Sequence, residues 1–184
     1  MNRLKGGFIT SSVAVLLAAG MTLNYSACSK ESPLQSAPVQ PNSTQLTFLK
    51  SQNPFLGTVF EVSQLITAAN GGSKEVGNEM TGYSRITFNP GDLSADLNVG
   101  FWWDSNRFEV KFSPHGSIFN NPVLIRLSYK DANLTGIEED SLRIWYYHEE
   151  EGIWEQAGYE LNKQLKYVEG TTTHFSRFAV AWAN

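Results

Sequence analysis

Short runs of alternating hydrophobic and polar residues follow one another along much of this chain. In the clearest run, Val123, Ile125, Leu127 and Tyr129 fall on one face, the period of two that is typical of a half-buried β-strand. Turn-forming residues such as Asn70-Gly71-Gly72 separate the runs. The pattern predicts strands at 46–49, 58–62, 84–88, 98–102, 108–112, 123–129, 142–147, 154–157, 166–168 and 177–182.

The lengths and spacing of these runs predict an all-β fold. The strands 142–147 and 154–157 flank an acidic turn and are expected to form a hairpin. Two segments, 62–69 and 135–140, have the pattern of a helical turn or two. Regularly spaced short strands with turns between them are typical of an antiparallel β-sandwich, so we expect one such domain over residues 45–184.

A different pattern occupies the start of the chain. Arg3 and Lys5 precede an apolar stretch, 8–23, that is interrupted by hydroxyl residues and shorter than the ~20 apolar residues of a membrane-spanning helix. A basic start followed by a short apolar core is typical of a secretory signal peptide. We therefore predict that residues 1–27 direct export.

The residues before Cys28 indicate which kind of export signal this is. The segment Leu23-Asn24-Tyr25-Ser26-Ala27 resembles the cleavage box of bacterial lipoproteins, with Tyr25 where an aliphatic residue is usual. The resemblance implies that residues 1–27 are a lipoprotein signal peptide. Cleavage by an ordinary signal peptidase, after Gly20 or Ala27, is the alternative.

Cys28 is the one cysteine of the sequence. A free thiol in an oxidising compartment is reactive, and here it has no second cysteine to pair with. A thioether to lipid removes that problem, so we predict that a lipid on Cys28 holds the protein to a membrane of the bacterial cell envelope. Ser29 in place of Asp after Cys28 is compatible with sorting to the outer membrane, on either its periplasmic or its surface face.

The segment that follows the cysteine is predicted to be a tether. Residues 28–44 are rich in serine and contain three prolines and few residues that could form a core, so we expect a disordered, partly extended linker. Removal of residues 1–27 would leave 12 basic and 18 acidic residues, a net charge of −6. This balance argues against nucleic acid as a partner, because phosphate backbones require clustered lysine and arginine.

Part of the chain resembles a known family. The segments Ile86-Thr87-Phe88-Asn89-Pro90-Gly91-Asp92-Leu93 and Pro114-His115-Gly116-Ser117-Ile118-Phe119-Asn120-Asn121-Pro122-Val123, followed by Trp154 and by His174-Phe175-Ser176-Arg177-Phe178, resemble the ZU-five domain over residues 71–184. This β-sandwich occurs in ankyrins, zona-occludens scaffolds and netrin receptors. Asp92 departs from the small residue usual there. The resemblance implies a non-catalytic module that holds a protein partner.

The tripeptide His174-Phe175-Ser176 suggests an alternative function. Some relatives of the ZU-five domain cut themselves between Phe and Ser, which would make Ser176 the nucleophile, Phe175 the donor of the scissile carbonyl, and His148 or His174 the assisting base. The competing interpretation is structural. In it, Phe175 is a core or edge aromatic, and Ser176 begins the buried face of the last strand.

Two adjacent tryptophans suggest a third function. Neighbouring residues of a strand point to opposite faces, so we expect one of Trp102 and Trp103 in the core and the other exposed, where it could stack on a sugar or anchor a partner. His115, His148 and His174 are far apart in the sequence and show no metal-ligand spacing.

The sequence contains no phosphate-binding glycine loop and no nucleophile elbow. The overall prediction is a lipid-anchored, non-catalytic β-sandwich lipoprotein without cofactor or metal. Autoproteolysis and carbohydrate binding are the alternatives.

Overall fold

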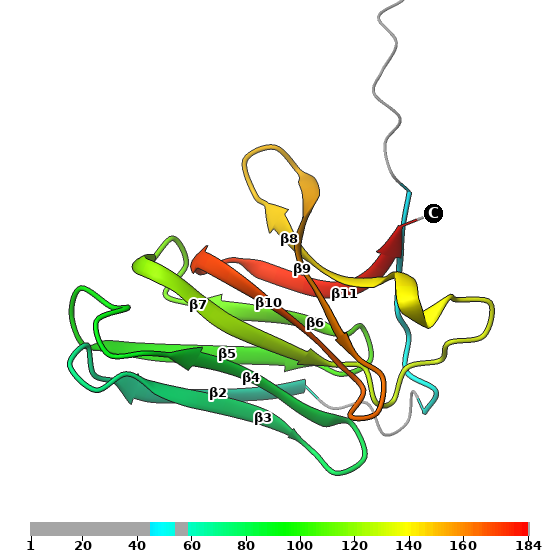
Figure 1. Ribbon diagram of the computed structural model, residues 1–184, viewed down its shortest axis with the longest axis horizontal. Coiled ribbons are helices and arrows are strands. Elements are labelled where there is room, and N and C mark those ends of the chain that lie inside the picture. The colour runs from blue at the N-terminus through cyan, green and yellow to red at the C-terminus, as the bar shows by residue number, and fades with distance from the viewer. Residues whose placement is uncertain (1–44, 54–58, 184) are drawn as a thin grey trace, which may run out of the picture. The chain divides into compact units, whose positions relative to one another are not determined.

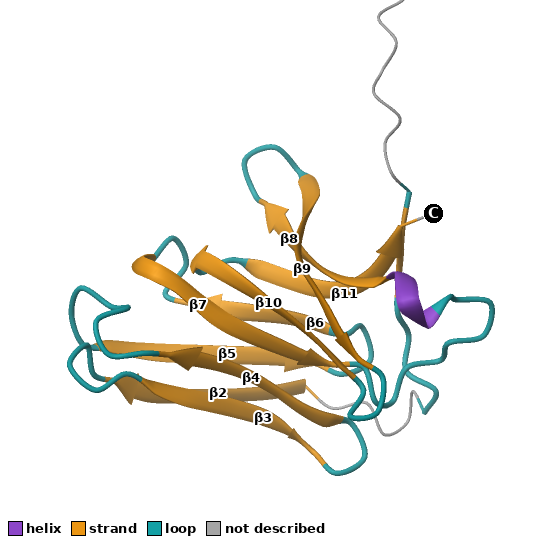
Figure 2. Cartoon of the chain, in the orientation of Figure 1, coloured by secondary structure: helices purple, strands orange, loops and turns teal. Residues whose placement is uncertain are grey.

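The computed structural model describes residues 45–53 and 59–183, and nearly all of its regular structure is β (Figures 1 and 2). The strands are β1 Leu46–Phe48, β2 Val59–Ile66, β3 Gly72–Asn78, β4 Gly82–Phe88, β5 Leu97–Asp104, β6 Glu109–Ser113, β7 Ile118–Ser128, β8 Leu142–His148, β9 Ile153–Asn162, β10 Tyr167–His174 and β11 Arg177–Ala183. A short 3₁₀ helix, η1 Glu139–Ser141, precedes β8.

The strands form one antiparallel sheet that curls back on itself. Its hydrogen-bonded order is β2-β5-β6-β11-β8-β9-β10-β7-β4-β3, and β1 pairs with the second half of β11. The two end strands, β2 and β3, are consecutive in the chain and are joined by a turn that the Thr67–Gly71 bridge closes. The sheet is therefore nearly closed into a barrel. The predicted all-β, antiparallel character is confirmed.

Alternation along the strands fills the interior. Val123, Ile125 and Leu127 of β7 are fully buried and Tyr129 is 1% exposed, as the period of two predicts. Phenylalanine dominates the rest of the core, because strands and connections from several parts of the sheet place an aromatic residue in the interior. These residues are Phe88, Phe101, Phe108, Phe112, Phe119, Phe175 and Phe178.

A pair of glycines allows the sheet to bend between β9 and β10. Gly158 and Gly170 lie opposite one another, beside a break in the regular register. A Cβ added to Gly158 would lie 2.6 Å from the Cα of Gly170, and the reverse substitution gives the same distance. No side chain fits in this gap, so the close approach of the two strands requires glycine at both positions.

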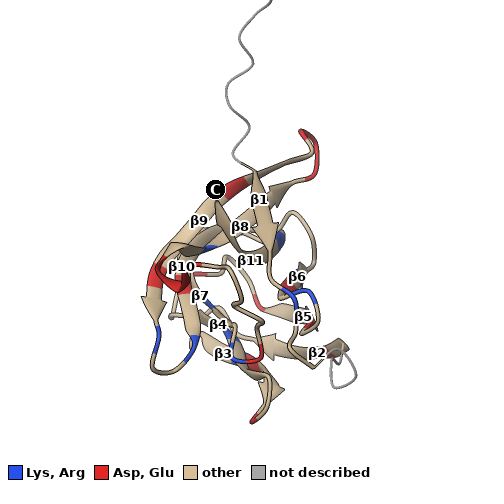
Figure 3. Ribbon diagram, turned by 90° about the vertical axis from the view of Figure 1, so that its right-hand side faces the viewer, with Lys and Arg blue, Asp and Glu red and all other residues tan. Residues whose placement is uncertain are grey.

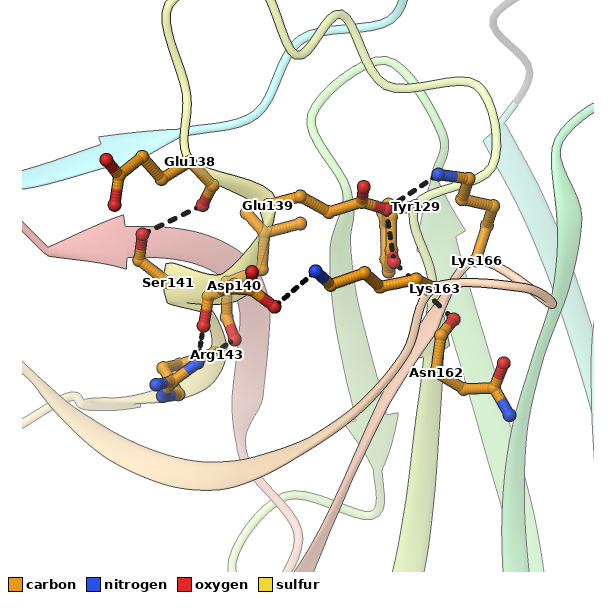
Figure 4. A network of polar contacts seen from close by, with 10 residues as sticks. Tyr129, Glu138, Glu139, Asp140, Ser141, Arg143, Asn162, Lys163 and Lys166 are labelled. Carbon is orange, nitrogen blue, oxygen red and sulfur yellow. Dashed lines mark hydrogen bonds and ion pairs between the residues drawn. The ribbon is translucent and has the colours of Figure 1, made fainter.

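Polar contacts stabilise the end of the sheet around η1 (Figure 4). The Tyr129 hydroxyl at the end of β7 donates a hydrogen bond of 2.8 Å to Glu139 Oε1, and Lys166 Nζ lies 2.6 Å from the same oxygen. Lys163 in the β9–β10 turn pairs with Asp140 at 2.5 Å. Burial, followed by the contact with Glu139, raises the pKa of Tyr129. The network connects η1 to both β7 and β10.

The hairpin of β8 and β9 is present as the sequence predicts and extends beyond its neighbours (Figure 1). Its tip is the acidic turn 149–151, red in Figure 3. Together with Phe175 and Ser176, at the corner where β10 passes into β11, this acidic turn lines one surface hollow, to which it contributes negative charge.

Three local predictions need correction. The expected helical turn at 62–69 is wrong, because β2 continues in extended form to Ile66. The one expected at 135–140 is reduced to the 3₁₀ turn η1, shifted towards the C-terminus. Strand β3 is missing from the prediction because its residues are mostly glycine and polar. It is held by pairing with β4, including an ion pair between Glu75 and Arg85.

The predicted signal peptide 1–27 and tether 28–44, including Cys28, lie outside the described residues. In the described part of the chain, no helix has the length and apolar character needed to cross a membrane. The first described strand, β1, pairs antiparallel with the end of β11, so that Leu46 lies opposite Ala183.

Candidate functional site

Phe175, in the short connection between β10 and β11, is a core residue. Its side chain is fully buried. Its ring centroid lies 4.9 Å from that of Phe119, 5.7 Å from that of Phe112 and 6.2 Å from that of Phe88. Its backbone N–H donates to the carbonyl of Ser117 at 3.0 Å. The residue therefore fixes the β10–β11 corner to strands β4, β6 and β7.

Ser176 is held by backbone contacts on both sides. It is 4% exposed, and its hydroxyl donates a hydrogen bond of 2.8 Å to the carbonyl oxygen of Tyr147 at the end of β8. Its own carbonyl accepts from the N–H of Phe112 at 3.2 Å. The hydroxyl proton is thus directed at a peptide carbonyl and not at an imidazole. A general base would first have to displace this bond.

The structure nevertheless brings the predicted histidines close to this corner. His148 and His174 line one open surface hollow of about 270 Å³ together with Phe175 and Ser176. His115, from the β6–β7 turn, lines the same hollow, as does the acidic turn 149–151. All three histidines of the chain therefore meet at one place. The sequence could not show this, because the three belong to different strands and turns.

Two residues of the hollow, Tyr146 and His148, share a polar contact with Glu155 of the neighbouring strand β9. Glu155 Oε2 accepts from the Tyr146 hydroxyl at 3.0 Å and lies 2.9 Å from His148 Nε2. Burial, and then the bond to Glu155, raises the pKa of Tyr146 to about 12. The bond to His148, followed by the bond to Tyr146, lowers the pKa of Glu155. The carboxylate is therefore the charged acceptor of this network at neutral pH.

His174 has the opposite character, because its environment disfavours the proton. Its ring meets the Tyr146 ring edge-on, with 5.5 Å between centroids. Burial, followed by repulsion from His148 and His115, lowers the pKa of His174. The side chain is accordingly a neutral imidazole at pH 7. Among the described residues, no three His, Cys, Asp or Glu side chains are arranged to hold a metal ion.

The two adjacent tryptophans separate as strand geometry requires. Trp103 is fully buried and meets Phe108 with a centroid distance of 6.1 Å. Trp102 is half-buried on the outer face of β5, where Lys111 Nζ lies 4.7 Å from its ring centroid. Of the two predicted binding aromatics, only Trp102 is accessible to a ligand.

Trp102 belongs to a row of side chains that crosses five strands. In register across β5, β6, β11, β8 and β9 lie Trp102, Lys111, Arg177, Tyr147 and Trp154. The Arg177 guanidinium carbon lies 4.1 Å from the Tyr147 ring centroid and 5.1 Å from that of Trp154, within cation–π range. We call this set the cation–aromatic row. No local sequence pattern predicts this row, because its members are neighbours only through strand register.

The chain was also compared with known proteins. Its sequence matches no protein-family model, and no curated protein matches it.

The lowered pKa of His174 predicts a pH-dependent stability. A histidine is protonated near pH 6.5 in the unfolded chain, and here the folded state takes up that proton less readily. Acid therefore favours the unfolded state. The free energy of unfolding should be constant above pH 7 and decrease from about pH 6.5 towards pH 5. Urea unfolding at a series of pH values measures this.

His174→Gln should flatten the pH dependence between pH 7 and 5, whereas His115→Gln, at the rim of the same hollow, should largely keep it. If the wild-type protein is equally stable at pH 7 and pH 5, or if His174→Gln retains the full decrease, the assignment to His174 is wrong.

Proposed function

We propose that the protein is a lipid-anchored lipoprotein of a bacterial cell envelope, in the outer membrane, whose β-sheet domain is a non-catalytic interaction module. Cys28 and the proline-rich segment 28–44 supply the anchor and the tether in this proposal. The observation that carries the non-catalytic assignment is the role of Phe175 and Ser176. The Phe175 side chain is fully buried in the core, and the Ser176 hydroxyl is bonded to a backbone carbonyl.

The proposal includes a ZU-five-like fold for residues 71–184. It is supported by the roles of the residues that carry the resemblance. Phe119 is buried, 6% exposed, between the turn at Gly116 and Pro122, and its ring packs on Phe88 and Phe175. Trp154 lies on β9, where the hairpin was expected. The motif residues thus act as packing and turn positions of the sheet.

The surface proposed for a protein partner is the β1–β9 end of the cation–aromatic row. Phe48 of β1 is 37% exposed, and its ring lies 5.1 Å from that of Trp154, which in turn lies 5.1 Å from that of Tyr147. Arg177 lies over both indole and phenol. Tryptophan, tyrosine and arginine are the residues that most often dominate protein–protein binding energy.

Autoproteolysis between Phe175 and Ser176 is the second candidate. The observation that favours it is the presence of His148 and His174 in the hollow beside Ser176. For cleavage, the Ser176 hydroxyl would have to leave the Tyr147 carbonyl and turn towards one of these imidazoles.

An intact-mass measurement separates these two candidates. We expect protein isolated from the envelope fraction to keep its full C-terminus, because the Ser176 hydroxyl is bonded to the Tyr147 carbonyl and to no imidazole. Ser176→Ala should show the same C-terminus. Loss of the nine-residue fragment Ser176–Asn184 from the wild type, together with its retention in Ser176→Ala, would establish self-cleavage and overturn the non-catalytic assignment.

A site-specific cross-link tests the proposed partner surface. With the photo-reactive residue p-benzoylphenylalanine in place of Phe48 in the full chain, illumination of cells should give one discrete adduct with another envelope protein. The adduct should be lost when Trp154→Ala is added, because the two rings are in contact.

The matched control carries the same photo-reactive residue in place of Tyr159, which is 68% exposed elsewhere on β9. It should give little or no adduct. An equal yield from position 159, no adduct from position 48, or an adduct that survives Trp154→Ala would contradict this surface.

A further inference from the structure

The opposite end of the cation–aromatic row borders a separate hollow on the outer face of β2, β5 and β6. It has a volume of about 380 Å³, and its outward-facing lining residues are Glu61, Gly100, Trp102, Lys111 and Ser113. Strand register places them together: Glu61 and Lys111 flank Trp102, and Ser113 lies opposite Gly100. The volume is in the range of small-ligand sites.

Gly100 lines the floor of the hollow, where a side chain would not fit. A Cβ at Gly100 would lie 2.1 Å from Ser113 Oγ. The Ser113 hydroxyl therefore occupies the space that a side chain at residue 100 would need, and glycine at this position lets that hydroxyl line the floor of the hollow. The indole of Trp102, two residues along the same strand, then borders the depression.

The polar groups around the indole have both signs and both hydrogen-bonding characters. The Glu61 carboxylate accepts hydrogen bonds, the Lys111 ammonium donates them, and the Ser113 hydroxyl can do either. One negative and one positive group face the same hollow, so the charges of its lining residues cancel. The hollow therefore does not favour a charged ligand over a neutral one. An aromatic surface edged by mixed donors and acceptors matches the apolar C–H face and the peripheral hydroxyls of a sugar ring.

We infer that the Trp102 hollow binds a neutral saccharide, with the sugar ring packed against the indole of Trp102 on the side that Lys111 Nζ, 4.7 Å from the ring centroid, leaves open, and its hydroxyl groups bonded to Glu61, Lys111 and Ser113. The site lies open on a sheet face, which suits a residue within a polysaccharide chain. This inference goes beyond the proposed protein-binding function. The saccharide site depends on Trp102, whereas the proposed protein surface depends on Trp154 at the far end of the row. Either proposal can therefore fail while the other holds.

The test uses the purified full-length protein and four neutral oligosaccharides: the hexamers of cellulose, starch, β-1,3-glucan and chitin. Titration calorimetry should detect binding of at least one at millimolar concentration. Trp102→Ala should weaken that binding by about tenfold or more, and Trp102→Phe, which keeps an aromatic surface, should weaken it less.

The control is Trp154→Ala, which removes another half-buried tryptophan of the same row without touching the hollow. It should bind the saccharide as the wild type does. The inference is overturned if none of the four hexamers binds, if binding survives Trp102→Ala, if Trp154→Ala weakens it equally, or if an acidic oligogalacturonide binds more tightly than every neutral hexamer.

Discussion

The arrangement of residues at the β10–β11 corner depends on the burial of the Phe175 side chain. Its ring packs against three other phenylalanines from β4, β6 and β7, in edge-to-face and stacked geometries that add to the gain from apolar burial. Because Phe175 is fixed, the residues on either side of it are fixed too. The Ser176 hydroxyl donates a hydrogen bond to the Tyr147 carbonyl, and the His174 ring meets the Tyr146 ring edge-on. His174 and Ser176 thereby line the hollow that His115 and His148 also border.

The two faces of the curled sheet then have different roles. The inner face is closed by aromatic packing, and the bend at Gly158 and Gly170 allows β9 and β10 to follow the curvature. The outer face carries the cation–aromatic row and the Trp102 hollow, which need no movement of the core to meet a ligand. Phe175 of the tripeptide that resembles a cleavage site packs in the core, while both proposed binding surfaces lie on the outer face.

The sequence predicts the strands well and their arrangement poorly, for a physical reason. Alternation reports whether one face of a segment is buried, so β4 to β8 and β11 are recognisable, whereas β3 at the sheet end has little apolar content and is not. Register between distant strands is not encoded in any local pattern. For that reason the sequence identifies Trp102, Phe175 and Ser176 individually but neither the row, the glycine-floored hollow, nor the meeting of His115 with His148 and His174.

The most direct test of the structural role of Phe175 is the free energy of unfolding of Phe175→Ala, measured in urea beside Phe175→Leu and the surface control Tyr159→Ala, whose side chain is 68% exposed. Because Phe175 is fully buried, Phe175→Ala should lower the free energy of unfolding by about 3–5 kcal/mol. Phe175→Leu should lower it less, and the exposed control should change it little. Phe175→Ala as stable as the wild-type protein would contradict the account, because the corner would then be held by something other than this side chain.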